Sequence, residues 1–469
     1  MTTDTTVESS ALAVQAENAM GFRFTAQGLS LDFASYVEDR LKFVSEDRTW
    51  IAFNGRCWDM ANARTIAESL WDEYLAQRLE TSRRLKGEDL TRELKAIAAI
   101  ANAHSRNEAL QLAQPKLAVS RDAFDRDAGH LLVTPTGTVN LKNGKLLANK
   151  PERMLTQCTS VGYVRDTPHP ERFGELIEKL SGDDEETTLW LWRALGYTLT
   201  GSVHEDAVFY LRGPGGNGKS TLIKTVFEIL GSYAAKLDIR VLASGSEYHA
   251  TELAHLRGAR FVVSSEIEKG MKLRESVLKD LSGGEVQTPR DIQQKAKDAA
   301  RWTPTCKLFL YGNHDLSVRG TDDGIWRRLN KIVSSHKFER TGLRDELVDR
   351  EGEAILSWMV RAAVEWHRVG LGEQPARVRA HTEEYRREQD ILGQYFTECL
   401  VFEAGAFESS SALRLSYDQW CKDRGYDYQA GPKEFEGRLR ERGCIESRSP
   451  KKQGQHRGWK GVQFKADLT

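Results

Sequence analysis

The 469-residue sequence has few cysteines, no long apolar run and no excess of one charge, and each absence excludes a class of protein. Its six cysteines lie far apart, which argues against a close-paired zinc site and against a disulfide-dense domain, so we expect reduced thiols. No run of about 18 apolar residues predicts a membrane span. Lysine and arginine total 67 against 68 acids, so any DNA-binding surface must be local.

The first 20 residues contain no lysine or arginine and are rich in Thr, Ser, Ala and acidic residues. This composition predicts a disordered tail over residues 1–20 rather than a secretory signal. Together with the expected free thiols, it predicts a cytoplasmic protein without a membrane partner.

Glycine is concentrated in residues 213–221, which read Gly-Pro-Gly-Gly-Asn-Gly-Lys-Ser-Thr. The segment fits the phosphate-binding pattern of two glycines separated by four residues and followed by Lys and Ser/Thr. Glycines let backbone N–H groups turn toward phosphate oxygens, a lysine reaches the β- and γ-phosphates, and a hydroxyl ligates Mg²⁺. We therefore expect ATP and Mg²⁺ as cofactors, and the candidate binding residues are Gly213, Gly215, Gly216, Gly218, Lys219, Ser220 and Thr221.

The flanks of this segment predict a strand followed by a helix. Residues 207–211 form an apolar and aromatic run suited to a buried strand. Apolar residues then recur at helical spacing from Leu222 to Leu230, and Gly231 ends the helix. The amino end of that helix would face the phosphates, which a glycine-rich loop occurring by chance would not explain.

Two later strands end in polar side chains that triphosphate hydrolysis could use. The strand over 260–266 ends in Glu266, which we expect to polarise the attacking water, with Glu268 as a lesser candidate. Ser265 stands where an acid on the metal side is usual. The strand over 307–313 ends in Asn313, whose amide could bond the γ-phosphate, although such an Asn alone is more often a turn residue.

Basic residues occur in two further segments. Arg327 and Arg328 are adjacent, which commonly means solvated charge, but one of them could neutralise the γ-phosphate of a neighbouring subunit. Arg290, Lys295 and Lys297 lie in a segment with few large apolar side chains. That segment is either an exposed polar loop or a hairpin tip that contacts the phosphates of single-stranded DNA.

These patterns predict an α/β protein organised around a P-loop ATPase core. We expect an α+β accessory domain with a hairpin at Asn54-Gly55 and a C-terminal domain with the helix, helix, hairpin order of a winged helix. From Gly431 to Lys465 there are ten Lys/Arg and four acids, a net charge of +6. The predicted parts are the tail at 1–20, the accessory domain at 21–175, the ATPase domain at 176–345, a helical linker at 346–380 and the winged-helix-like domain at 381–469.

In this order the motifs resemble those of superfamily 3 helicases, most of all the helicase half of phage- and plasmid-encoded primase–helicases related to the poxvirus primase–helicase. Asn217 before Gly218-Lys219 is typical of this group. The resemblance is specific over residues 195–330 and weaker over most of 25–469. The matching strings are Leu-Gly-Tyr at 195–197, Leu-Thr-Gly at 199–201, the 213–221 segment, Ser265-Glu266, Leu-Ser-Gly-Gly-Glu at 281–285, Arg290, Gly312-Asn313 and Asp-Gly-Ile-Trp-Arg-Arg at 323–328.

The resemblance implies an AAA+-like core and a homohexameric ring with ATP between subunits. Such a ring translocates on single-stranded DNA and unwinds forked DNA during replication of a phage, plasmid or integrated mobile element, in a bacterial or phage-infected cytosol. The implied roles are nucleotide binding by Asn217, Lys219 and Ser220, Mg²⁺ binding by Ser220 and Glu266, water orientation by Glu266, γ-phosphate sensing by Asn313, action across the interface by Arg328 or alternatively Arg327, and DNA contact by Arg290, Lys295 and Lys297.

Three points qualify this interpretation. The residues before the core contain no convincing carboxylate cluster for nucleotidyl transfer, so we expect no primase activity in this chain and a separate primase as a plausible partner. A non-translocating, ATP-switched origin-binding or loader protein would carry the same motifs, and a strand-displacement assay distinguishes it. A small-molecule kinase would explain the glycine-rich loop but neither Asn313 nor Arg328.

Overall fold

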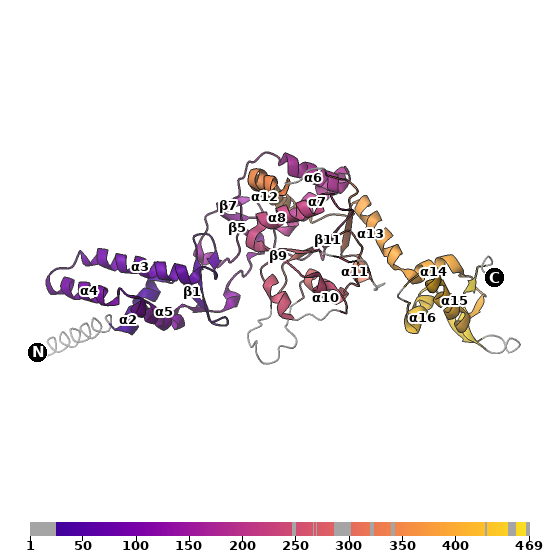
Figure 1. Cartoon of the computed structure of the whole chain (residues 1–469), viewed down its shortest axis with the longest axis horizontal. Helices are drawn as coiled ribbons and strands as arrows, with labels where there is room; N and C mark the ends of the chain where they lie inside the picture. Colours follow the sequence, from indigo (N-terminus) through magenta and orange to yellow (C-terminus); the bar gives the residue numbers. More distant parts are fainter. Residues whose placement is uncertain are drawn as a thin grey trace, which may run out of the picture.

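The computed structural model describes residues 25–245, 250–265, 267–268, 270–285, 302–318, 323–338, 343–426, 429–448 and 456–465. The tail predicted at 1–20 lies outside these residues, as do Glu266 and the three predicted DNA contacts Arg290, Lys295 and Lys297. The described chain forms an N-terminal lobe, a central sheet flanked by helices and a C-terminal domain, arranged in a row (Figure 1). Within it, no helix is both long and apolar enough to cross a membrane.

The N-terminal lobe combines four helices with two small sheets. The predicted hairpin is present: Phe53 pairs with Trp58, and the Asn54 side chain accepts hydrogen bonds from the backbone of Arg56 and Cys57. Gly55 in this turn has a φ of +90°, a conformation that favours glycine. The elements are α2 Ala26–Val37, β1 Leu41–Val44, β2 Thr49–Phe53, β3 Trp58–Asp59, α3 Ala63–Ser82, α4 Gly87–Ile100, α5 Ala103–Leu117, β4 Ala118–Val119, β5 Leu131–Thr134, β6 Gly137–Asn140 and β7 Lys145–Leu147. β1 to β4 form one sheet, and β5 to β7 form an antiparallel meander.

The central sheet has five parallel strands in the order β12-β8-β11-β10-β9. The strands are β8 Val208–Arg212, β9 Ala234–Lys236, β10 Phe261–Ser264, β11 Lys307–Gly312 and β12 Leu329–Val333. β8 therefore lies between two strands that come much later in the chain. This arrangement confirms the predicted α/β class with a parallel sheet, whose strands β8, β10 and β11 match the predicted runs to within one or two residues.

Alternate residues of the strands face two separate apolar layers. Phe209 and Leu211 belong to one layer, and Val208 and Tyr210 belong to the other. In the first layer, the Phe209 and Phe309 rings stack with centroids 4.6 Å apart. Helices α6 Glu171–Ser181, α7 Glu185–Thr198, α8 Lys219–Leu230 and α12 Leu343–Val369 cover the first layer, and α9 Ile239–Leu242, α10 Glu275–Ser282, α11 Asp323–Trp326 and α13 Ala376–Gln389 contribute to the second (Figure 1).

Helix α12 packs directly on the core, although most of it falls in the segment predicted as a linker at 346–380. Ile355, Met359 and Ala363 are fully buried in the first apolar layer. Gly196 of α7 lies so close to α12 that a Cβ added there would be 2.4 Å from Ala362 C and Ala363 N. The glycine of the Leu-Gly-Tyr string thus permits a close approach of two helix backbones.

The C-terminal domain contains three helices and short strands around the buried Tyr395, Tyr417 and Trp459. Its elements are α14 Ile391–Cys399, β13 Leu400–Val401, β14 Phe407–Ser409, α15 Ser410–Asp423, α16 Pro432–Glu441, β15 Ile445–Arg448, β16 Arg457–Lys460 and β17 Gln463–Phe464. β16 pairs with both β14 and β15. The helix, helix, hairpin order expected from the sequence is therefore observed.

The contact between α7 and α12 predicts that Gly196→Ala is destabilising. Alanine favours a helix by about 1 kcal/mol over glycine, but the added methyl group has no room, and overpacking of this kind costs about 1–3 kcal/mol. Differential scanning calorimetry should show a lower midpoint for the unfolding transition of the core. Gly437→Ala, in α16 with no atom within 4 Å of the added Cβ, is the matched control and should not lower stability. Equal or greater stability of Gly196→Ala would contradict the close approach.

Candidate nucleotide-binding site

The glycine-rich loop lies where three parallel strands end at the same level. Arg212, the last residue of β8, pairs in register with Gly312 of β11 and Val333 of β12. Because the strands are parallel, the residues that follow meet at one edge of the sheet, and Gly213, Asn313 and Ser334 begin the three connecting segments there. The predicted loop and Asn313 are thus brought together at the carboxyl edge of the sheet.

Close contacts explain two of the glycines in this loop. A Cβ on Gly213 would lie 2.1 Å from the carbonyl oxygen of Ser334, and one on Gly218 would lie 2.5 Å from Leu176 Cδ1. Gly218 also has a φ of +84°. The loop is further fixed by a 2.7 Å hydrogen bond from Phe338 N to Gly216 O. Its backbone is therefore held in place before any ligand binds.

Lys219 is a buried cation whose contacts with the described residues are all to neutral acceptors. Its side chain is 4% exposed, and Nζ donates to Gly213 O at 2.7 Å, Pro214 O at 3.1 Å and Asn217 Oδ1 at 2.7 Å, with Asn313 Oδ1 at 3.5 Å. Within the part of the chain that the structure describes, no carboxylate forms an ion pair with it. Burial, with a smaller contribution from Arg212, lowers the pKa of Lys219 to about 8.

Asn217 connects the lysine to the neighbouring strand end. Its side chain is 2% exposed, and its Nδ2 donates to Ser334 O at 2.9 Å while its Oδ1 accepts from Lys219. Sequence patterns did not indicate Ser334 or Phe338, because both hold the loop through backbone atoms, which any residue type supplies. Only the alignment of the strand ends could have indicated them.

A cavity of about 430 Å³ opens over this loop. Ser220 is exposed at its wall, and Asn313 and Ser265 face the same space. Its volume falls in the range of about 300–1,000 Å³ that is usual for small-ligand sites. The residues lining it are Gly215, Gly216, Asn217, Gly218, Lys219, Ser220, Thr221, Ser265, Ile267, Tyr311, Gly312, Asn313 and His314.

The two adjacent arginines lie at the opposite edge of the sheet. The carbonyl oxygen of Arg328 accepts a 2.8 Å hydrogen bond from Val208 N, at the amino end of β8. The glycine-rich loop begins after the carboxyl end of the same five-residue strand, about 13 Å away at the usual rise per residue. Arg327 and Arg328 instead form ion pairs with Asp206, so the fold does not bring them to the loop of their own chain.

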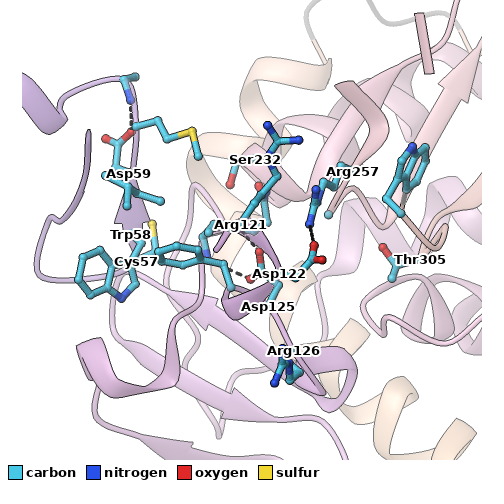
Figure 2. A pocket seen from close by; sticks show the side chains of 18 of the residues that line it. Cys57, Trp58, Asp59, Arg121, Asp122, Asp125, Arg126, Ser232, Arg257 and Thr305 are labelled. Carbon is cyan, nitrogen blue, oxygen red and sulfur yellow. Dashed lines mark hydrogen bonds and ion pairs between the residues drawn. The ribbon is translucent and has the colours of Figure 1, made fainter. Parts of the chain in front are cut away.

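A larger cavity of about 780 Å³ separates the N-terminal lobe from the core (Figure 2). Arg257 and Asp122 point toward one another across it and form an ion pair at 2.7 Å. Two of its three arginines are ion-paired, Arg257 with Asp122 and Arg121 with Asp47, and the tryptophans in its wall, Trp58 and Trp302, are buried rather than available for stacking. Among the described residues it therefore offers no open aromatic surface of the kind found in a single-strand site.

Two family models and several viral proteins match parts of the chain. A family described as D5 N terminal like matches residues 32–181, and a family of unknown function, DUF5906, matches residues 211–328. The chain is 25% identical over 298 residues to "Putative helicase L207/L206" of Acanthamoeba polyphaga mimivirus, and 24% identical over 320 residues to "Putative primase C962R" of African swine fever virus (strain Badajoz 1971 Vero-adapted). The chain thus carries a D5 N terminal like region and a DUF5906 region and is homologous to these viral proteins, which supports the primase–helicase type inferred from the motifs.

The alignments cover a larger share of this chain than of its viral relatives. The alignments cover 58% and 62% of this chain but 30% and 33% of the two relatives, so the chain spans about a third of their length. Among solved structures, the apo C-terminal region of NrS-1 aligns over 90% of this chain and 96% of that chain, with 11% identity and a TM-score of 0.46.

The environment of Lys219 predicts that polyphosphate binding takes up a proton at pH 8. Near its pKa of about 8 the free lysine is only about half protonated, and a bound anion favours the charged form and raises that pKa. Affinity should therefore be constant below pH 8 and fall as the pH rises above it, by up to about tenfold per pH unit. Calorimetry with tripolyphosphate in two buffers of different ionisation enthalpy measures the uptake, which should be about half a proton at pH 8.

The control for this measurement is Lys219→Arg. A guanidinium remains charged throughout this pH range, so any binding that persists in the variant should occur without proton uptake. Binding to the unsubstituted protein with no proton uptake at pH 8 would contradict the assignment of Lys219 as the anion-contacting cation.

Proposed function

We propose that the chain is an ATP-dependent DNA helicase that forms a homohexameric ring, translocates on single-stranded DNA and unwinds forked DNA in the replication of a phage, plasmid or integrated mobile element. The observation that carries this proposal is Lys219, a buried cation with no acidic partner among the described residues, inside a glycine-rich loop held by backbone contacts. Homology to the viral proteins, which carry helicase and primase names, supports the DNA-directed activity.

The loop has the properties required to bind the triphosphate of ATP. Gly213 to Gly218 lead into the amino end of α8, where free backbone N–H groups and the helix dipole favour negative charge. Lys219 can exchange its carbonyl contacts for phosphate oxygens. Asn313 lies 3.5 Å from the Lys219 ammonium, so its amide is within reach of the same terminal phosphate and of a water molecule beside it.

The donor set on the cavity wall fits Mg²⁺. Mg²⁺ prefers oxygen ligands and is usually bound through few protein groups together with substrate phosphates. The exposed Ser220 hydroxyl provides such an oxygen, and Glu266, outside the described residues, is the proposed second contributor. When bound, Mg²⁺ would neutralise negative charge on the phosphates of the nucleotide.

The separation of the loop and the arginines favours a site completed by two subunits. In a head-to-tail ring, the amino edge of one sheet can face the carboxyl edge of the next. Arg328 is the proposed cation for the neighbouring γ-phosphate, with Arg327 as the alternative. Arg328 is 11% exposed and Arg327 is 64% exposed, so in the free chain Arg327 is the more accessible of the two.

The C-terminal domain is the proposed duplex- or fork-binding part. Its order of helices, with β14 paired to the β15–β16 hairpin, is that of a winged helix. In α16, Arg438 is ion-paired with Asp390 and Arg440 with Glu436. These ion pairs make the two arginines less available for contacts with DNA phosphates. Exposed basic residues on the hairpin strands, Arg448, Arg457 and Lys460, are the better candidates. This domain also suits the alternative function, a non-translocating ATP-switched origin-binding or loader protein, which would hydrolyse ATP without displacing a strand.

Mixed rings test the two-subunit site. Lys219→Ala should abolish ATP hydrolysis, and Arg328→Ala should retain ATP binding but lose turnover by about 10³-fold, as arginine fingers do. Mixing the two variants should restore hydrolysis at roughly a quarter of the interfaces, because an intact loop then meets an intact arginine from its neighbour. Arg327→Ala with Lys219→Ala decides between the arginines. Full activity of an isolated monomer would rule out the proposal.

The proposed DNA contacts predict a change in salt dependence. Lys295→Ala with Lys297→Ala should weaken binding of a fluorescent oligo(dT) and reduce the slope of log K against log salt by about 1.4, since each phosphate contact to a single strand contributes about 0.7. ATP hydrolysis without DNA should be unchanged. The matched control is the pair Lys422→Ala and Lys433→Ala on the C-terminal domain. An equal effect of this control on the slope would contradict a specific role of Lys295 and Lys297 in binding single-stranded DNA.

A further inference from the structure

The turn before β8 has an aspartate in an unusual backbone conformation. Asp206 has a φ of +52°, and its backbone N–H donates to Val203 O at 3.0 Å. The turn is tied to the core by the adjacent Glu205, whose Oε1 accepts from Trp366 Nε1 at 2.7 Å and from Leu371 N at 2.9 Å. The shape of the turn therefore does not depend on the Asp206 carboxylate, which can form contacts outside the turn.

That carboxylate is shared by both adjacent arginines. Arg328 Nη2 lies 3.0 Å and Arg327 Nη2 lies 3.5 Å from the same oxygen, Asp206 Oδ2. Of the acids in the described ranges, Asp206 alone forms an ion pair with either arginine. The Arg327 contact is the longer of the two and that side chain is the more exposed, so Arg327 can leave while Arg328 remains paired.

The rest of the Arg328 guanidinium is held more loosely. Nη1 donates to Gly324 O at 2.7 Å, and Nε is buried without a hydrogen-bond partner among the described residues. A buried donor without a partner carries a free-energy cost, which an incoming acceptor would relieve. Among the described residues, Asp206 and Gly324 O are thus the two partners that restrain the orientation of this guanidinium, and Asp206 is the charged one.

The Leu-Ser-Gly-Gly-Glu string at 281–285 packs against this ion pair. A Cβ on Gly283 would lie 3.3 Å from Arg328 Nη2 and 3.6 Å from Asp206 Oδ1. Gly284 has a φ of +70°, and a Cβ there would lie 2.7 Å from Val203 Cγ2. The two glycines let the end of α10 approach the arginine and the Asp206 turn together. The chain then continues into residues 286–300, which carry the three proposed DNA contacts.

We propose that Asp206 is a positioning residue for the arginine that acts across the subunit interface, with Gly283 as the small surface against which that arginine rests. This inference rests on the proposed two-subunit site. Asp206 holds Arg328 at the amino edge of the sheet and leaves the more exposed Arg327 beside it. It thereby determines how the arginine pair is presented to the triphosphate of the next protomer.

The test is the variant Asp206→Asn in the full-length protein. Asparagine has nearly the same shape and tolerates positive φ, so only the charge is removed. The turnover number for ATP should fall by about 10–100-fold while the Michaelis constant is unchanged, because the loop that binds ATP in the same chain is intact. Asp206→Glu should recover part of the turnover. Asp183→Asn, at another aspartate with positive φ that pairs with Lys179, should retain full turnover.

Mixing with Lys219→Ala subunits separates the possible causes of a loss. If Asp206 acts on the arginine, Asp206→Asn and Lys219→Ala subunits should restore hydrolysis together, as Arg328→Ala and Lys219→Ala do. If only the Arg328→Ala mixture recovers, Asp206 acts within its own ATP-binding loop and the inference is wrong, while the proposed function stands. If neither mixture recovers, the two-subunit site itself fails and this inference fails with it.

A second variant reaches the same side chain without altering the carboxylate. Gly283→Ala adds a methyl group 3.3 Å from Arg328 Nη2, at a residue whose φ of −90° suits alanine. It should also reduce the turnover number at an unchanged Michaelis constant and be rescued by Lys219→Ala subunits. Normal turnover in both Asp206→Asn and Gly283→Ala would overturn the inference.

Discussion

The burial of the Lys219 ammonium among neutral oxygens is the constraint around which the carboxyl edge of the sheet is arranged. A buried charge is costly unless it is paired, and here carbonyl and amide oxygens from two segments, the glycine-rich loop and Asn313, compensate it only in part. The loop can surround the ammonium because Gly213 and Gly218 have no side chains to collide with Ser334 and Leu176. Among the described residues no carboxylate offsets this charge, an arrangement that would favour an incoming anion.

The amino edge of the same sheet contains two more buried cations, but their surroundings differ. Lys307 donates to Thr200 O and Ser202 O, and Arg260 donates to Leu199 O and Ala128 O. Burial lowers the pKa of both side chains, and the rings of Tyr197 and Tyr233 lie against them. These two cations fasten the turn at 199–202 to the sheet and to the N-terminal lobe. The Leu-Thr-Gly string is thus explained by structure rather than by catalysis.

Sequence patterns predicted the parts of the fold that depend on local chemistry. The strand before the glycine-rich loop, the helix after it and the turn at Asn54-Gly55 all follow from residue spacing or turn preference, and the structure has them at the expected positions. Helix α5 was not anticipated, because its sequence has little apolar periodicity and contains Pro115. Strand order, and with it the anchoring of the loop by Ser334 and Phe338, depends on contacts between distant segments that no local pattern encodes. The pairing of Asp206 with both arginines is of the same kind.

Helix α13 connects the edge of the cavity over the glycine-rich loop to the C-terminal domain through specific hydrogen bonds. Residues 314–318 follow Asn313 directly, and two side chains of α13 bind this segment. The Tyr385 hydroxyl donates to Leu316 O, and Gln389 Oε1 accepts from Val318 N at 3.0 Å. Lys331 N donates to Thr382 Oγ1 at 3.1 Å, so α13 also caps the outer strand of the sheet. Because α14 begins at Ile391, two residues after α13 ends, there is little slack between these contacts and the C-terminal helices. A displacement of the segment after Asn313 would therefore move α13 as well. Because Tyr385 of α13 is buried in the core and the connection to α14 is short, such a movement would be passed on to the C-terminal helices.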